Sequence, residues 1–326
     1  MTDPAFEVND LHVSFPAHGG MVQAVRGVSF SVQPGELLGI VGESGSGKSV
    51  TVLAAMGLLP ESAIVTGEVK VGGFDLLKAT KKQWQAARGR KIAMIFQDPL
   101  SALNPTHRIG AQVAEMIRSH QDVSKEAAAA RAVDLLDLVG IPQPKDRARQ
   151  YPHEFSGGMR QRVMIAMAIA NDPDVLIADE PTTALDVTVQ AQILEVIQNI
   201  QNQTGAAVVF ITHDLGVVAR IADQVQVMYA GRPVERGNVH SIFDHPSHPY
   251  TLGLMGSMPG LGNERLIPIP GAPPNMLHPP SGCAFRVRCP HSVPDCAVGL
   301  PDLHPFGDLE TACIRAEELA VTVGSL

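Results

Sequence analysis

The sequence predicts an α/β fold with a mainly parallel sheet, followed by a small irregular domain rich in cysteine and proline. Two observations carry this prediction. Continuous apolar strands, such as residues 37–41 and 175–178, alternate with helical segments through the first 235 residues, a pattern typical of a parallel sheet. Beyond residue 235, periodicity is lost, all four cysteines occur, and thirteen of the 25 prolines fall between Pro246 and Pro305.

The elements follow from local patterns of apolar residues, glycine and proline. A helix at 125–139 is amphipathic and ends at Gly140, and the helix at 187–203 ends at Gly205. In chain order we expect strands at 6–8, 11–15, 28–32 and 37–41, a helix from 48 towards 59, strands at 67–74 and 92–96, mostly helix from 99 to about 169, a strand at 175–178, a helix at 187–203 and a strand at 206–212.

Composition limits the class of protein. The chain has 326 residues, 45% of them hydrophobic, and a net charge of −8, so no overall basic field draws it to nucleic acid. The start shows no basic region followed by an apolar run, so we expect no signal peptide. The longest apolar runs, at 163–170 and 206–211, are shorter than the ~20 residues of a membrane span. We therefore expect a soluble or peripheral protein in the cytoplasm, with no nucleic acid partner.

A glycine-rich octet links the strand at 37–41 to the following helix. Its backbone amides can surround a β-phosphate, a lysine can reach the β- and γ-phosphates, and a serine hydroxyl can bind Mg²⁺. The residues assigned to this ATP site are Gly42, Ser44, Gly45, Ser46, Gly47, Lys48 and Ser49. The complete octet between an apolar strand and a helix is much more specific than a glycine-rich turn alone.

Two carboxylates follow the apolar strand at 175–178. Asp179 is placed to hold Mg²⁺ through water, and Glu180 is the expected base or water-orienting group. An isolated Asp-Glu pair is more often an exposed strand end, but the preceding buried strand favours the catalytic interpretation.

A second anion site is predicted at Ser156-Gly157-Gly158-Met159-Arg160-Gln161. Ser156 can cap a helix that begins near Met159, which leaves the amides of Gly157 and Gly158 free at its positive end. One chain with two different phosphate-binding surfaces suggests that two chains meet head to tail, with nucleotide between them.

These motifs together resemble the ABC-type ATPases. The resemblance implies a P-loop (RecA-like) core with an antiparallel β subdomain and a helical subdomain at about 98–170, the whole domain covering 1–235. It also implies that Gln97 senses Mg²⁺ and the attacking water, that His213 contacts the γ-phosphate and that Phe15 stacks on adenine. The Ser156–Gln161 signature would bind the ATP of the partner subunit, and Asp186 of Ala184-Leu185-Asp186 would lie in a dimer loop.

Four cysteines, Cys283, Cys289, Cys296 and Cys313, are spaced C-x5-C-x6-C-x16-C. A structural zinc site usually contains a tight C-x2-4-C pair, which is missing here. Four thiolates at wider spacing suit a 4Fe–4S cluster at least as well, and Arg286, Arg288 and Arg315 would offset its charge. Zinc and four unconnected thiols remain alternatives, and His291 is a candidate substitute ligand.

The segment from 236 to 326 resembles the C-terminal extension of ATP-binding subunits in dipeptide and oligopeptide importers, through Asp244–Thr251, Gly282–Phe285 and Arg288–Pro290. In that group the cysteines are similar to those that bind a 4Fe–4S cluster. The resemblance implies a peripheral ATPase on the cytoplasmic face of the membrane, using ATP and Mg²⁺. Its partners would be a second ATPase subunit, identical or paralogous, two membrane permease subunits and an external solute-binding protein.

Other functions stay open at this point. The same extension occurs in nickel-type importers, so the cargo is not fixed. A non-transport ABC ATPase acting on DNA or the ribosome, an exporter subunit and an iron–sulfur regulator are further alternatives, each lacking positive support in the sequence.

Coupling to membrane subunits is expected at residues 99–117, directly after Gln97. The apolar residues Ile109, Val113 and Met116 have the spacing of one helix face and would line a groove for a membrane-subunit helix. The alternative is that the three residues only pack the helical subdomain.

Overall fold

The computed structural model describes residues 3–183, 185–257 and 268–323. The chain divides into two compact units, each assembled from separate stretches of sequence. The first unit contains residues 1–6, 31–36 and 70–211, and the second contains 7–30, 37–69 and 212–326.

The first unit contains a parallel sheet of the strands β6 (Ile92–Ile95), β7 (Val175–Asp179) and β8 (Ala207–Thr212). All residues of the three strands are buried, as expected for parallel strands covered on both faces. Two short elements, β5 (Phe74–Asp75) and α2 (Lys81–Ala87), precede this sheet. The expected α/β class and parallel sheet are confirmed.

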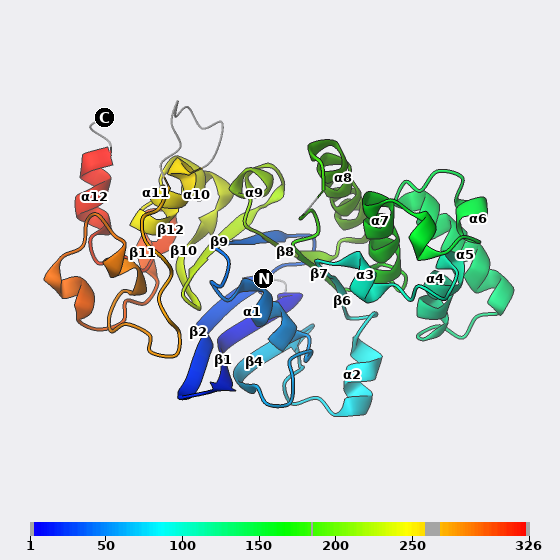
Figure 1. Ribbon diagram of the computed structural model, residues 1–326, viewed down its shortest axis with the longest axis horizontal. Helices are drawn as coiled ribbons and strands as arrows, with labels where there is room; N and C mark the ends of the chain where they lie inside the picture. The colour runs from blue at the N-terminus through cyan, green and yellow to red at the C-terminus, as the bar shows by residue number, and fades with distance from the viewer. Residues whose placement is uncertain (1–2, 184, 258–267, 324–326) are drawn as a thin grey trace. The chain divides into compact units, whose positions relative to one another are not determined.

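Helices make up most of the remaining first unit (Figure 1). Helices α3, α4 and α5 pack against α7, and α4 packs along α5. The stretch from 99 to about 169 is therefore mostly helical, as expected. The helices are α3 (Pro99–Ala102), α4 (Ile109–Arg118), α5 (Lys125–Leu138), α6 (Pro144–Arg147), the 3-10 turn η1 (Pro152–Glu154), α7 (Gly157–Ala168) and α8 (Val187–Thr204).

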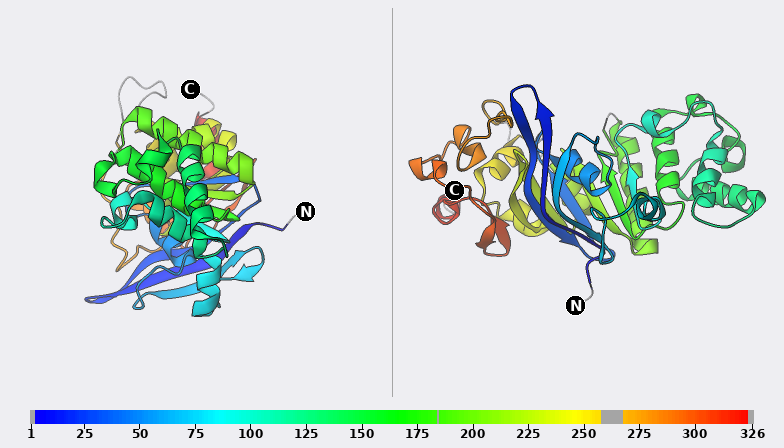
Figure 2. Two further views of the ribbon diagram at one scale, coloured as in Figure 1. Left: turned by 90° about the vertical axis from the view of Figure 1, so that its right-hand side faces the viewer. Right: turned by 90° about the horizontal axis from the view of Figure 1, so that it is seen from below.

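The second unit begins with long strands. β1 (Phe6–Ala17) and β2 (Gly20–Val32) lie side by side, with β4 (Ile64–Val71) on the other edge of β1 (Figure 2). The sequence predicts three short strands here, and the structure has two long ones instead. The polar residue Asp10 does not end its strand, because it turns locally at φ 45° while its amide donates to Ser29 Oγ over 2.9 Å.

A second sheet of this unit runs in the order β3 (Leu37–Val41), β9 (Gln224–Tyr229), β10 (Arg232–Asn238), β12 (Leu309–Thr311) and β11 (His304–Phe306). β3 and β9 are parallel, and the other pairs are antiparallel. The last two strands belong to the C-terminal extension, and β12 pairs with β10 in the register Glu235↔Thr311. The expected boundary at residue 235 therefore falls inside a strand, which the loss of periodicity after that point did not indicate.

The remaining elements of the second unit are short. Its 3-10 turns η2 and η3 carry or adjoin three of the four cysteines. The elements are α1 (Lys48–Ala55), α9 (Leu215–Ile221), α10 (Val239–Asp244), α11 (Pro249–Gly256), η2 (Ala284–Val287), η3 (Pro294–Ala297) and α12 (Ala316–Val323).

Candidate functional site

The glycine-rich octet forms the turn between β3 and α1, as the sequence predicts. Gly42 adopts φ 153° and Gly47 adopts φ 100°. A Cβ at Gly42 would lie 2.3 Å from the carbonyl oxygen of Met228, and one at Gly47 would lie 2.6 Å from that of Ala24. Neither position accepts a side chain, so the loop conformation depends on glycine.

Lys48, the first residue of α1, folds back over the loop. Its Nζ donates to the carbonyl oxygens of Gly42 over 2.7 Å and Glu43 over 3.0 Å, and the residue is buried. Ser46 N donates to the carbonyl oxygen of Glu43 over 3.2 Å. The first amides of α1 have no intrahelical acceptor, so the loop, the helix end and the ammonium group together favour an anion.

The two carboxylates lie at the end of β7 in the first unit. Asp179 ends the strand and is buried. Glu180 adopts φ 47°, unusual for a residue with a side chain, and such strain costs about 1–3 kcal/mol and clusters at functional sites. Its amide donates to the carbonyl oxygen of Ile211 over 2.9 Å, which fixes the residue beside the end of β8.

Gln97 lies beside Glu180. Its Nε2 donates to Glu180 Oε2 over 3.4 Å, and Thr183 Oγ1 donates to the same oxygen over 2.8 Å. The structure thus brings together two of the residues to which the family resemblance assigns the attacking water, although they are 83 positions apart in sequence.

His213 lies in the second unit, exposed between β8 and α9. The next residue, Asp214, caps α9 by accepting from the amides of Gly216 and Val217, and its own amide donates to Thr212 Oγ1 over 3.0 Å. These bonds fix the backbone on the C-terminal side of the histidine.

The signature segment forms the start of α7. Ser156 Oγ accepts from Met159 N over 3.3 Å, so the predicted cap is present, but the helix already begins at Gly157. A Cβ at Gly158 would lie 2.5 Å from Val189 Cγ1 of α8, so glycine is needed for the helices to approach. Ser156 and Gly157 are exposed, whereas Gln161 is buried in the helical core.

Asp186 and Phe15, the two residues expected at the edges of the site, lie at a helix start and in a strand. Asp186 caps α8 by accepting from Val189 N over 3.0 Å, and Ala184 of the same loop lies outside the described residues. Phe15 is half-buried in β1. Their roles toward nucleotide and partner stay predictions.

The apolar stripe at 109–116 packs the helical subdomain. Ile109 and Val113 are fully buried and Met116 is partly buried, so the structure favours the packing alternative. The buried amide of Gln112 donates to the carbonyl oxygens of Asn104 and His107, which attaches the preceding loop to α4. The one large apolar residue exposed in α3 is Leu100, whose side chain is directly accessible.

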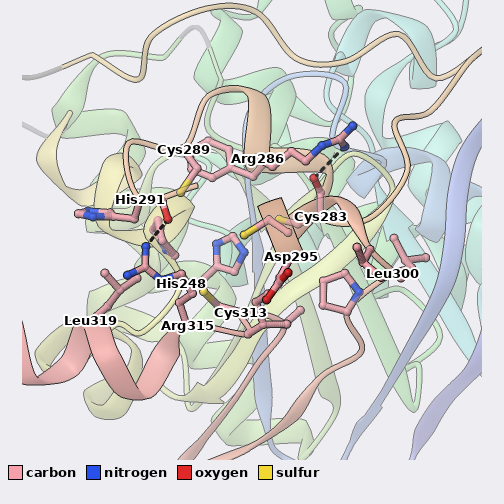
Figure 3. A pocket seen from close by; sticks show the side chains of 18 residues that line it. His248, Cys283, Arg286, Cys289, His291, Asp295, Leu300, Cys313, Arg315 and Leu319 are labelled. Atoms are coloured by element: carbon pink, nitrogen blue, oxygen red, sulfur yellow. Dashed lines mark hydrogen bonds between the residues drawn. The ribbon is translucent and has the colours of Figure 1, made fainter. Parts of the chain in front are cut away.

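All four cysteines line one cavity of about 220 Å³ in the extension (Figure 3). Within the described residues, no three His, Cys, Asp or Glu side chains are placed to hold a single metal ion. Burial raises the pKa of Cys283 and Cys289, and raises that of Cys313 to about 11. Without a compensating cation the three thiols are therefore protonated near neutral pH.

His248 also lines this cavity and lies among the labelled cysteines in Figure 3. Complete burial lowers its pKa to about 3, and its Nδ1 accepts from Tyr250 N over 3.0 Å, so the neutral ring carries its proton on Nε2. Sequence reasoning missed His248 as a cavity residue. The His-Pro-Tyr order at 248–250 was visible, but nothing local indicated that it faces the cysteines.

No described helix is long and apolar enough to cross a membrane.

Comparisons with known proteins agree with the observed motifs. The family model described as ABC transporter matches residues 25–183, and the model described as oligopeptide/dipeptide transporter, C-terminal region, matches residues 234–296. The dimeric ATP-binding cassette MJ0796, bound to ADP and Pi, is similar with a TM-score of 0.64 and 25% identity, over 72% of this chain and 98% of that one.

Curated relatives match both regions. The oligopeptide transport ATP-binding protein OppD of Bacillus subtilis is 56% identical, over 88% of this chain and 82% of its own length. OppD of Haemophilus influenzae is 49% identical over 97% of this chain and 99% of its own. OppD of Mycobacterium tuberculosis is 54% identical over 96% of this chain, which spans about half, 52%, of that protein.

The fold and the motif set are those of an ABC ATPase cassette. More particularly, the chain belongs to the ABC transporter family, in its group of oligopeptide and dipeptide transport ATP-binding proteins.

Proposed function

We propose that the chain hydrolyses ATP and couples this reaction to the import of oligopeptides or dipeptides. The observation that carries the proposal is the presence of two different anion-binding helix starts in one chain: the loop before α1, and the capped start of α7. An ATPase that works alone needs only one such surface. A pair of chains arranged head to tail uses both.

Within the site, we assign roles residue by residue from the family resemblance. The loop amides and Lys48 bind the β- and γ-phosphates, and Ser49 ligates Mg²⁺. Asp179 holds Mg²⁺ through water. Glu180, with Gln97 beside it, orients the attacking water, and His213 contacts the γ-phosphate. The bond between Gln97 and Glu180 supports this pairing of roles.

Other assigned residues complete the proposed cassette. Phe15 stacks on adenine, Ser156, Gly157 and Gly158 bind the γ-phosphate held by the partner, and Asp186 lies near the dimer interface. Buried Gln161 supports the signature helix from inside. The proposed domains are the cassette up to about residue 235, with the helical subdomain at about 98–170, and the extension from 236.

The partners follow from the class. We propose a second ATPase subunit, identical or paralogous, two membrane permease subunits and an external solute-binding protein, with this chain held peripherally on the cytoplasmic face. The named relatives act in oligopeptide and dipeptide transport, which favours peptides as cargo over nickel or another small solute.

The decisive test of dimer-dependent hydrolysis is the dependence of ATPase rate on protein concentration. If one catalytic unit contains two chains, the specific activity rises with concentration until the dimer is saturated. Isolated monomers that hydrolyse ATP at full rate, with a specific activity independent of concentration, would contradict the head-to-tail proposal.

The test of cargo uses proteoliposomes that contain the permease subunits and both ATPase subunits. Labelled dipeptide and oligopeptide should accumulate only with ATP and a peptide-loaded binding protein, and Ni²⁺ should not replace the peptide. Stimulation of the ATPase by Ni²⁺-loaded binding protein, with no response to peptide, would transfer the assignment to the metal importers.

We place the coupling surface at α3 and the loop that follows it. Leu100 exposes 58% of its surface in α3, only three residues after Gln97. Gln97 contacts Glu180, and Leu100 is an exposed apolar side chain close to Gln97 in the sequence. A membrane subunit that binds Leu100 would therefore sense a movement of Gln97. The buried residues Ile109 and Val113 of α4 then pack the helices that hold this surface.

For the cysteine cavity we propose a 4Fe–4S cluster held by Cys283, Cys289, Cys296 and Cys313. Four thiols line one space of about 220 Å³, whereas one water needs only ~10–15 Å³ of such volume. The cavity therefore has room for a polynuclear group. When bound, the cluster supplies iron–thiolate bonds that join the separate segments of the extension.

The cluster is tested by anaerobic purification. Brown protein with iron and sulfide at about four each per chain is the expected result, since a cubane cluster has that composition. One zinc per colourless chain would support the zinc alternative, and metal-free protein with four reactive thiols would support unconnected cysteines.

A further inference from the structure

An ion pair joins the cysteine segment to the phosphate loop. Arg288 Nη1 lies 2.6 Å from Glu43 Oε2, and Arg288 Nη2 lies 2.9 Å from Glu43 Oε1. The arginine side chain is only 5% exposed and the glutamate side chain 26%. A two-point pair with so little solvent exposure has fixed geometry and is stronger than the usual surface ion pair.

The guanidinium of Arg288 is fixed independently of the glutamate. Its Nε donates to the carbonyl oxygen of Pro270 over 2.8 Å, and its Nη1 donates to Tyr229 Oη over 3.3 Å. The group also lies 5.8 Å from the ring centre of Tyr229 and 5.9 Å from that of Phe285. The arginine therefore presents both of its terminal nitrogens to the loop in a defined direction.

The backbone of Glu43 takes part in several hydrogen bonds of the phosphate loop. Its amide donates to Tyr250 Oη over 2.8 Å, and its carbonyl oxygen accepts from Ser46 N and from Lys48 Nζ. Any displacement of Glu43 therefore moves an acceptor that orients the lysine ammonium. Two separate segments, at 250 and 288, therefore contact this single residue, and Tyr229 and Phe285 pack against the arginine.

We propose that Arg288 is a positioning residue for nucleotide binding: through Glu43 it holds the phosphate loop in the shape that accepts the phosphates of a nucleoside triphosphate. The proposal rests on the proposed binding of ATP at this loop. The cysteine extension then contributes to the nucleotide site through Glu43, because Arg288 immediately precedes Cys289 in the chain.

Two simpler explanations make different predictions for Glu43→Gln. If only the net charge near the phosphates matters, loss of this carboxylate strengthens nucleotide binding. If the pair only attaches the extension, the variant lowers stability and leaves binding unchanged. Positioning predicts weaker binding in spite of the more favourable charge.

The experiment measures the Kd of ATP without magnesium, which prevents turnover, on the full-length protein by calorimetry. Arg288→Met should raise the Kd about tenfold, equivalent to ~1.4 kcal/mol, and Glu43→Gln should raise it several-fold. Arg288→Lys should be intermediate, because an ammonium cannot make the two-point pair. The double variant should bind no more weakly than Arg288→Met, because both changes break the same interaction.

The matched control is Arg236→Met. Arg236 pairs with Glu310 between β10 and β12 and belongs to the same unit, but its hydrogen bonds go to Glu310 and to the carbonyl oxygen of Ser29 and not to the loop at 42–49. The Kd of ATP for Arg236→Met should stay within twofold of the wild-type value, even if the substitution lowers Tm. At saturating MgATP, kcat of Arg288→Met should fall less than its KM rises, a split that general destabilisation does not produce.

The proposal is wrong if Glu43→Gln binds ATP as tightly as wild type or more tightly, or if the effects of the two substitutions simply add. Should Arg288→Met fail to fold, Arg288→Lys and Glu43→Gln still decide the result, because both keep the size of the native side chain. A wild-type chain that binds no nucleotide would instead contradict the proposed function itself.

Discussion

The phosphate loop and the cysteine segment both hold irregular backbone in one conformation, but they do so by different means. The loop joins a strand of five fully buried residues to a helix, and its glycines fit against neighbouring carbonyl groups. The cysteine segment lies on 3-10 turns, and the strands β11 and β12 of the extension have three residues each.

In the segment that carries the cysteines, arginine side chains bond to the irregular backbone. Arg286 donates to the carbonyl oxygen of Ser281, Arg288 to that of Pro270 and Arg315 to that of His291. A small region held by such bonds has little core and gains most from a cross-linking group. Changes in the cassette should therefore alter nucleotide chemistry, whereas changes at the cysteines should alter stability.

The largest effect on nucleotide chemistry, as opposed to stability, is expected for Glu180→Gln. Loss of a general base or water-orienting carboxylate should lower kcat by about 10²–10⁴-fold, while ATP binding is kept and a nucleotide-bound dimer accumulates. Stopped-flow or coupled assays give kcat, and size-exclusion chromatography with ATP gives the dimer. Unchanged turnover would remove Glu180 from the catalytic step, and a large fall in Tm would place its main role in the fold.

The next largest effect is expected for Lys48→Ala. Loss of charge-assisted hydrogen bonds to phosphate, each contributing ~1.5–3 kcal/mol, should raise the Kd of ATP by roughly 100-fold. Ser44→Ala, which leaves the loop amides in place, is the matched control and should bind within a few-fold of wild type. Retention of tight binding by Lys48→Ala would show that nucleotide is held elsewhere.

Sequence reasoning predicted the local structure of the contiguous motifs. The octet 42–49 forms the turn before α1 and Ser156 caps α7, as residue order indicated, while the anion sites at both places stay predictions. The role of Gln97 required the family resemblance, because no local signal in the sequence places it beside Glu180. No local signal connected Glu43 with Arg288, since 245 positions separate them.

The same reasoning explains the errors. The spacing of Ile109, Val113 and Met116 correctly predicted one helix face, but periodicity does not tell whether that face meets the subdomain or a partner. In the extension, proline-rich sequence hid β11 and β12, because strands of three residues are too short to show alternation.

Replacing all four cysteines by serine should act on stability. Without the cross-linking group, Tm should fall by a few °C for each kcal/mol of stability lost, because ~1 kcal/mol shifts Tm by about 2–4 °C in domains of 150–250 residues. The Kd of ATP should rise no more than in Arg288→Met, because the segment that carries Cys283, Cys289 and Cys296 contacts Glu43 of the loop through Arg288. A variant Tm equal to that of the wild type, measured by calorimetry on anaerobically prepared protein, would show that the cysteines do not stabilise the extension.

A smaller and more selective effect is expected at Leu100. Leu100→Glu places a charge on the exposed apolar side chain of α3 and should reduce peptide uptake several-fold in the assembled transporter, while the ATPase of the isolated subunit stays within twofold. Leu138→Glu is the control, because Leu138 is also exposed but ends α5. Equal uptake by both variants and wild type would place the coupling surface outside α3.

The smallest effect on ATP binding should come from substitution of Phe15, which is half-buried in β1. Adenine stacking requires only an aromatic face, so Phe15→Tyr should leave the Kd of ATP within twofold. Phe15→Ala should raise it by roughly tenfold, since stacking of a base on an aromatic side chain contributes ~1–3 kcal/mol. The Kd of inorganic triphosphate, which has no base, separates stacking from damage to β1, because only damage weakens both ligands. Equal loss for ATP and triphosphate in Phe15→Ala would assign Phe15 to the strand, and the adenine contact would have to be sought on another residue of the second unit.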